Sequence, residues 1–178
     1  MEEYYTQGIV ITRAWAGERD ATVIAYTEMF GKIRAKVCGV QKLTSKLSGH
    51  LVPGIFADLR IVERKNGGFQ IVESFSQGCK STITAEIFSF LHVINTIVPL
   101  EERDERVWKL LTMVMQEGIY PTKVYRPLLT VLGFGPDHAT CSWCNGFKVR
   151  YFIPQDVVFL CGSCFNREKE THGEAITF

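Results

Sequence analysis

The chain has 178 residues, enough for one large domain or two small domains with real hydrophobic cores. Its 46% hydrophobic and 22% charged content and formal net charge of +1 are ordinary for a globular protein, so bulk charge indicates neither a nucleic-acid nor a membrane partner. The start, Met1-Glu2-Glu3, is too acidic for a signal peptide, and no apolar run approaches the roughly 20 residues that span a bilayer. We therefore expect a cytoplasmic protein without a membrane span.

The first part of the chain is typical of β-structure. Five short segments are rich in β-branched or alternating apolar residues, and most are separated by turn signals such as Lys65-Asn-Gly-Gly68. The expected strands are residues 8–15, 21–27, 32–37, 56–64 and 69–75. Five short strands in about 75 residues indicate a small closed barrel of the OB type.

After Ser81 the apolar spacing becomes helical. A first helix is expected from a cap at Ser81 or Thr82 to Ile97, a second over 101–117, and a third near 123–132. The fold class is therefore α+β and multidomain, with an N-terminal OB-fold barrel, a central helical bundle and a four-cysteine module. The expected domains are 1–80 for the barrel, 81–136 for the helices, 137–165 for a module inserted in or following them, and 166–178 for a short polar tail.

Two identical cysteine pairs carry the strongest chemical signal. Cys141 and Cys144 form one Cys-x-x-Cys pair, Cys161 and Cys164 form the other, and sixteen residues lie between the pairs. Two such turns that face each other make a tetrahedral sulfur site, which is typical of one structural zinc ion. The alternatives are reduced pairs, two disulfides, or a redox site, although a redox site needs only one pair. Four thiolates leave no open coordination position, so the zinc is expected to hold structure and not to catalyse.

A basic segment without acids runs from Met29 to Ala57. Strand alternation predicts that Lys32, Arg34 and Lys36 share one face, with spacings of about 7 Å. We expect these cations to bind a nucleic-acid backbone, with Lys42 and Lys46 extending the row. Other candidate contacts flank the row: Arg13 and Arg60.

An ordinary solvated strand face is the alternative interpretation of this row. Base stacking would need exposed aromatic rings, and Trp15 at a strand end and Phe30 in a turn are the better candidates. The sequence shows neither a P-loop nor a dinucleotide fingerprint, and no catalytic constellation. We therefore expect a protein that is not an enzyme.

Several segments together resemble the RecO family of bacterial recombination mediators. They are Gly8-Ile-Val-Ile, the turns at 18–20 and 27–32, Gly39-Val-Gln-Lys-Leu-Thr-Ser-Lys-Leu-Ser-Gly-His-Leu51, and Leu128-Leu-Thr-Val-Leu-Gly-Phe-Gly-Pro136 before Cys141. The resemblance implies a nucleoid-associated accessory protein of DNA repair that binds single- and double-stranded DNA and anneals complementary strands. It also implies partners, namely RecR, single-stranded-DNA-binding protein (SSB) and, indirectly, RecA. The resemblance also implies that the basic residues of the acid-free segment contact DNA and that the four paired cysteines are metal ligands.

The chain departs from this family in two places. Fourteen residues follow Cys164, where family members usually continue into further helices, so no SSB-docking residues are carried over to this chain. Cys38 stands before Gly39, where a small or basic residue is more usual. A protein-interaction adaptor with a structural barrel and little DNA affinity remains the alternative function.

Overall fold

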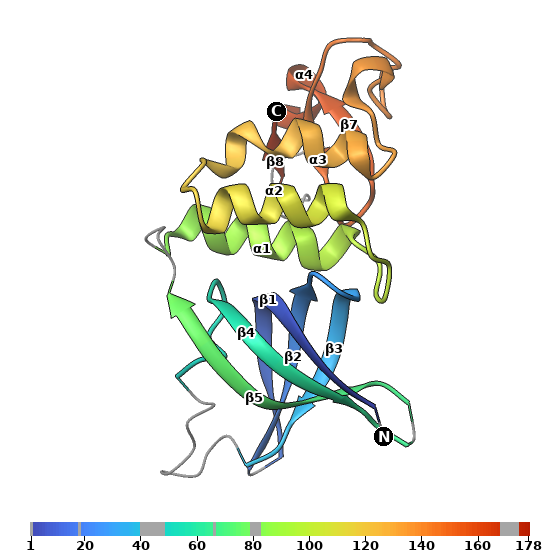
Figure 1. The fold of residues 1–178 in the computed structure, drawn as a ribbon. Helices are drawn as coiled ribbons and strands as arrows, with labels where there is room; N and C mark the ends of the chain where they lie inside the picture. Colours follow the sequence, from blue (N-terminus) through green and yellow to red (C-terminus); the bar gives the residue numbers. More distant parts are fainter. Residues whose placement is uncertain (1, 18, 40–48, 66, 79–82, 168–174) are drawn as a thin grey trace. The chain divides into compact units, whose positions relative to one another are not determined.

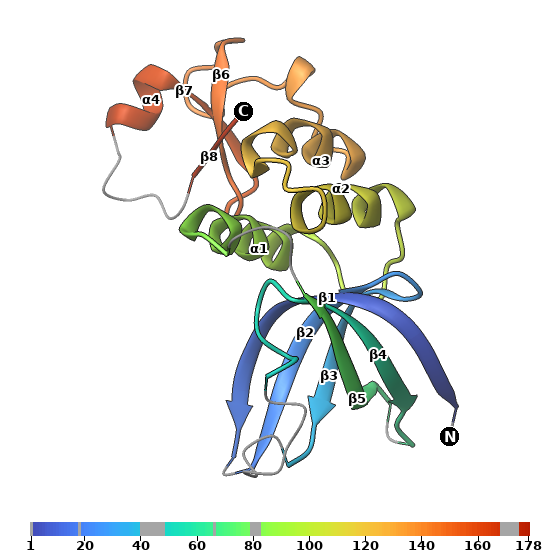
Figure 2. The ribbon, with the colours of Figure 1, turned by 60° about the vertical axis from the view of Figure 1, so that its left-hand side comes forward.

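The structure is a computed structural model that describes residues 2–17, 19–39, 49–65, 67–78, 83–167 and 175–178. The chain forms two compact units, Met1–Gly118 and Ile119–Phe178 (Figures 1 and 2). The helices expected as one domain over 81–136 are therefore divided between the two units. No helix in the described parts of the chain is both long and apolar enough to cross a bilayer.

The first unit contains a closed barrel of five strands. They are β1 (Glu3–Ala16), β2 (Asp20–Thr27), β3 (Gly31–Val37), β4 (Phe56–Glu63) and β5 (Phe69–Gly78). The order around the barrel is β1-β2-β3-β5-β4, and β4 pairs with β1 to close it. The β3–β5 pair is parallel, whereas the other four pairs are antiparallel. This topology confirms the predicted barrel of the OB type.

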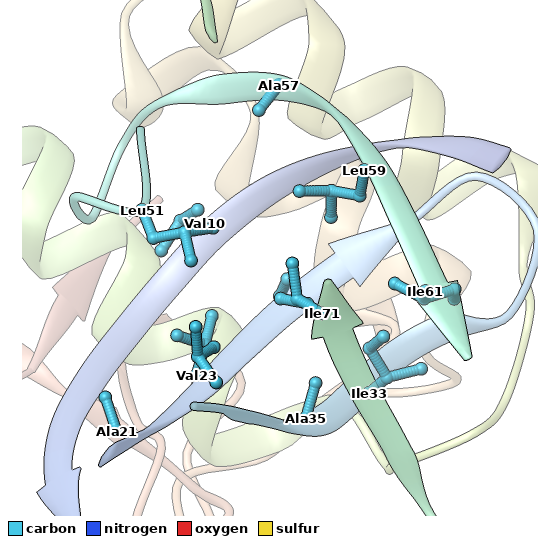
Figure 3. Packing of buried hydrophobic residues seen from close by; sticks show 12 residues of the cluster. Val10, Ala21, Val23, Ile33, Ala35, Leu51, Ala57, Leu59, Ile61 and Ile71 are labelled. Atoms are coloured by element: carbon cyan, nitrogen blue, oxygen red, sulfur yellow. The ribbon is translucent and has the colours of Figure 1, made fainter. Parts of the chain in front are cut away.

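Side-chain alternation places one face of each strand inside the barrel. On β3, Ile33, Ala35 and Val37 are fully buried, as their spacing predicts. Figure 3 shows the interior side chains that converge from different strands, among them Val10, Val23, Leu59, Ile61 and Ile71. Each fully buried aliphatic side chain of this kind contributes about 1.5–3 kcal/mol to folding, so the barrel is held mainly by its apolar interior.

Two helices belong to the same unit and lie beside each other at one end of the barrel (Figures 1 and 2). The helix α1 (Ala85–Ile97) begins after Thr84, whose side chain accepts a hydrogen bond from the Ile87 N–H. The cap predicted at 81–82 lies outside the described residues. The helix α2 (Glu105–Met115) packs on the barrel through Trp108, whose ring stacks on Tyr26 with a centroid distance of 6.3 Å.

The segment between the two helices corrects the predicted start of the second helix. Glu101 has a left-handed backbone with φ 60°, and its N–H donates to the Lys32 carbonyl over 2.7 Å. This strand-like pairing against β3 delays α2 until Asp104 caps it by accepting from the Arg106 N–H. Gly31 has φ +69°, and a Cβ atom there would collide with the Glu102 carbonyl oxygen, so this close approach requires glycine.

The second unit combines short helices with a small sheet. Its elements are η1 (Pro121–Lys123), α3 (Tyr125–Val131), η2 (Pro136–His138), β6 (Val149–Ile153), β7 (Val158–Cys161), α4 (Gly162–Arg167) and β8 (Ile176–Thr177), where η denotes a 3-10 helix. The strands form an antiparallel sheet in the order β7-β6-β8. The polar tail expected over 166–178 is therefore partly structured, because Ile176 is buried and pairs with Phe152.

Candidate functional site

The four cysteines of the two pairs come together in the second unit. Their Sγ atoms all lie within 4.8 Å of one another, and Cys144 and Cys161 approach to 3.7 Å. Cys141 and Cys164 are buried, while Cys144 is exposed. All four cysteines are free thiols, so the structure does not contain the two disulfides that were the alternative interpretation. The arrangement brings together every cysteine that the sequence predicted as a ligand.

Backbone geometry explains why the first pair converges. The Cys141 N–H donates to the Gly146 carbonyl, and the Asn145 N–H donates to the Cys141 carbonyl, each over 2.8 Å. Asn145 takes a left-handed backbone with φ 57°, which tightens the turn. A Cβ atom on Gly146 would lie only 3.3 Å from the Cys144 Sγ, so glycine gives the sulfur room. The second pair straddles the junction of β7 and α4, where the Cys164 N–H donates to the Cys161 Sγ over 3.4 Å.

The thiols differ in how readily they ionise. Burial is the largest influence on the Cys141 thiol and raises its pKa, but backbone N–H donors from Cys144, Cys161 and Trp143 outweigh it and bring the pKa to about 6. Burial, followed by the neighbouring sulfurs, raises the pKa of the Cys164 thiol to about 12. Four sulfurs this close cannot all carry negative charge without a cation among them. A bound divalent cation would stabilise all four thiolates.

The donor set and its spacing fit a metal ion. A tetrahedral ion with metal–sulfur bonds of about 2.3 Å separates its ligands by about 3.8 Å, close to the Cys144–Cys161 approach. Soft thiolate ligands select zinc, copper(I) or iron–sulfur chemistry over magnesium or calcium. Cys141, Cys144, Cys161 and Cys164 would hold the ion, and a closed four-sulfur shell gives it a structural role.

On the barrel, the structure corrects the expected exposure of Lys32. Its side chain lies on the outer face of β3 but is only 5% exposed, and its Nζ donates to the Asn95 carbonyl in the last turns of α1 over 2.8 Å. Burial, and then repulsion from Arg34, lowers the pKa of Lys32. The prediction of three aligned, solvent-facing cations is therefore wrong for Lys32, because strand alternation cannot show which part of an outer face a helix covers.

Two cations of β3 do reach solvent. Arg34 is exposed, and Lys36 is half-buried and pairs with Asp20 over 2.8 Å. The hydrogen bond to Asp20 is the main cause that raises the pKa of Lys36, while nearby Arg64 opposes it. Arg64, which the sequence reasoning missed, therefore lies within electrostatic reach of Lys36. Arg64 lies just before the turn from β4 to β5, and β5 pairs with β3. This position in the sequence could have indicated that Arg64 lies near the cations of β3.

The other expected DNA contacts do not join this group. Arg60 contacts Glu3 and also pairs with Glu73 over 2.8 Å, so two carboxylates neutralise it. Arg13 pairs in register with Val23, a residue of the barrel interior, and its guanidinium lies 5.0 Å from the Trp15 ring centroid. Arg13 therefore faces the opposite side of the sheet from Arg34. The remaining candidates, Lys42 and Lys46, lie outside the described residues.

Aromatic exposure also differs from expectation. Trp15 is exposed, as predicted, whereas Phe30 is half-buried between Tyr4 and Phe69 and packs on the core. Tyr5 and Phe75 are 72% and 64% exposed beside a hollow of about 550 Å³ on the outer face of the barrel. Sequence reasoning missed them, although alternation along β1 already places Tyr5 opposite the buried Thr6.

Comparison with known proteins gives one consistent family. A family model described as "Recombination protein O N terminal" matches residues 1–77. A protein named DNA repair protein RecO from Halalkalibacterium halodurans is 27% identical over 186 residues, covering 96% of this chain and 72% of the relative. Proteins of the same name from Dehalococcoides mccartyi and a Nocardioides species are 24% and 28% identical, and they cover 93% and 90% of this chain.

Proposed function

We propose that the chain is a recombination mediator of the RecO family that binds DNA through its N-terminal barrel. The relatives support a role in DNA repair and recombination. In the proposed activity the barrel binds single- and double-stranded DNA and anneals complementary strands. With RecR, the protein then helps to load RecA onto single-stranded DNA that is coated by SSB.

The observation that carries this proposal is a closed OB-type barrel with exposed Arg34 on its outer face. Lys36 lies on the same strand face, and Arg64 is close enough to influence Lys36 electrostatically. Barrels of this type bind single strands by combining a basic surface with exposed aromatic rings. Tyr5 and Phe75 supply exposed rings on the outer face of the barrel.

The mechanism would be physical and would need no chemical step. Cations on the barrel would replace condensed counterions on two DNA strands and lower the repulsion between the strands. Base pairing could then proceed at a higher local concentration of complementary bases. We propose that the metal held by the four cysteines is zinc, one ion per chain, which stabilises the second unit.

The test is annealing of two complementary oligonucleotides, bare or coated with SSB, followed by fluorescence across a salt series. The Arg34→Glu variant removes an exposed cation for which the structure shows no partner among the described residues. The matched control is Lys109→Glu, an equal charge reversal at an exposed position on α2. We expect Arg34→Glu to slow annealing and weaken strand binding by about fivefold or more at 0.1 M salt, with little change in the control.

The outcomes separate the proposed activities. Annealing that falls steeply with salt and with Arg34→Glu supports DNA binding by the barrel. Annealing of bare but not SSB-coated strands would support the barrel function and contradict action on SSB-coated DNA. If the unmodified protein anneals nothing at any salt concentration, the mediator proposal fails and the adaptor function replaces it.

A further inference from the structure

A second basic and aromatic surface lies beside the cysteine cluster. It forms a hollow of about 580 Å³ whose lining includes Phe147, Lys148, Arg150, Cys161 and Gly162. All of these residues belong to the second compact unit, so no residue of the barrel contributes to this surface. Neither the charge pattern of the barrel nor a structural role for the cysteines accounts for it.

Phe147 is the most exposed of the large hydrophobic side chains that the structure describes, with 84% of its surface accessible. An aromatic ring in water contributes nothing to the core, and this one lines a hollow together with two cations, which is a combination suited to binding a ligand. The ring does not sit on a loose loop. It follows Gly146, whose carbonyl accepts from the Cys141 N–H over 2.8 Å, so the cysteine turn anchors the backbone beside it.

The surface is also positively charged. Lys148 and Arg150 are both exposed, and neither side chain makes an ion pair within the described residues. Residues 138–167 contain Lys148, Arg150 and Arg167 but a single acid, Asp156. In contrast to Arg60 on the barrel, these two cations pair with no carboxylate in the part of the chain that the structure describes. Cations of this kind favour a polyanionic ligand.

We propose that this zinc-module surface, defined by Phe147, Lys148 and Arg150, binds an unpaired segment of single-stranded DNA. Phe147 stacks on one unpaired base, and the two cations contact the neighbouring phosphates. Duplex DNA does not offer a free base face, so the exposed ring makes the site selective for single strands. This inference rests on the proposed function, since it assumes that the chain binds DNA. It adds a second DNA contact outside the barrel.

The test uses the full-length, zinc-loaded protein and measures binding of a fluorescent oligothymidylate, an abasic strand of equal length, and a duplex. We expect Phe147→Leu to weaken oligothymidylate binding by about fivefold or more, and to leave binding of the abasic strand unchanged. Phe147→Tyr, which keeps a stacking ring, should retain the affinity. Phe147 is exposed and is not a metal ligand, so the variants should keep their zinc and their fold.

A charge test accompanies the ring test. The Lys148→Gln/Arg150→Gln variant should reduce the slope of log affinity against log salt by about 1.4, because each phosphate contact on a single strand contributes about 0.7. The control is Lys123→Gln/Arg126→Gln, which removes two exposed charges from the same unit outside the hollow. This control should leave the slope unchanged.

The results can overturn this inference without touching the proposed function. If the unmodified protein binds DNA and Arg34→Glu weakens binding, but the Phe147 and Lys148/Arg150 variants match their controls, the zinc-module surface is not a DNA site. If these variants instead lose binding of an acidic peptide while DNA binding is unchanged, the surface is a protein-docking site and the inference is wrong. Absence of DNA binding by the unmodified protein would refute the proposed function itself.

Discussion

Lys32 and Arg34 stand two positions apart on the outer face of one strand, yet only Arg34 reaches solvent. The Lys32 ammonium donates to the Asn95 carbonyl near the C-terminal end of α1, where the helix dipole favours a cation. Burial lowers the pKa of Lys32, because removing the ammonium from water costs free energy. The hydrogen bond to the Asn95 carbonyl offsets part of this cost. At this position, a basic residue joins the barrel to a helix.

This contact predicts effects of very different size for two substitutions at residue 32. Lys32→Met keeps the buried methylene chain and removes the desolvated charge, so the free energy of unfolding should change by no more than about 1.5 kcal/mol. Lys32→Glu should cost about 3 kcal/mol or more, because it buries a carboxylate against a carbonyl oxygen. Urea unfolding followed by circular dichroism measures both.

DNA binding provides the complementary readout for residue 32. The Lys32→Met variant should bind single strands within about twofold of the unmodified protein, since a buried ammonium contributes no phosphate contact. A folded Lys32→Met variant that has lost its DNA affinity would show that Lys32 contacts DNA after all.

At the level of elements, Asp104 links α2 to the barrel. Its side chain caps the helix by accepting from the Arg106 N–H over 2.8 Å. Its backbone carbonyl accepts from the Tyr26 hydroxyl over 3.0 Å. The hydrogen bond from the Arg106 side chain is the largest of the influences that lower the pKa of Asp104. Ionisation of the Asp104 carboxylate therefore strengthens the cap.

The pH dependence of this cap can be predicted with its sign. Because the pKa of Asp104 is lower in the folded than in the unfolded chain, the extra stability of its carboxylate is present above the ordinary aspartate pKa of 3.8 and is lost as pH falls through the folded pKa. Asp104→Ala should therefore cost about 1 kcal/mol at pH 7 and less at pH 2.

Asp104→Asn is the matched control, because asparagine caps helices without titrating. Urea unfolding of the three proteins at several pH values measures the effect. An Asp104→Ala difference that stays constant down to pH 2 would contradict a titrating cap.

For the whole molecule, the two compact units differ in what holds them together. The barrel has a continuous apolar interior drawn from all five strands. The described core around the cysteines is much smaller and includes Cys141 and Cys164 themselves beside Ile153 and Leu160. A core of this size rarely supports a fold without a metal or a disulfide. The module around the cysteines should therefore depend on the proposed metal ion, and the barrel should not.

Cys161→Ser, or chelation of the metal, tests this difference. Loss of the ion should unfold the cysteine module, because metal binding to such sites is coupled to folding. Limited proteolysis with mass spectrometry should show new cleavage within 119–178 and continued protection of the barrel. Undiminished zinc content together with an unchanged melting temperature in Cys161→Ser would contradict the assignment of the ligand.

Residue patterns that repeat over a few positions were sufficient to predict the local structure. Alternation predicted the inward face of β3, and paired Cys-x-x-Cys turns predicted the four-sulfur cluster, since both depend on spacing along the chain alone. The five strands were also predicted within a few residues of their ends, except β1, which begins earlier, at Glu3.

Only the tertiary structure decided which of the predicted cations are available to a ligand. Lys32 is covered by α1, whose Asn95 lies 63 residues along the chain, and Arg60 is neutralised by Glu3, 57 residues away. The pairing of Ile176 with β6 likewise depends on a distant partner. Residue spacing encodes which way a side chain points from its own strand, but exposure and ion pairing depend on which distant segments pack against it, and those contacts form only when the chain folds.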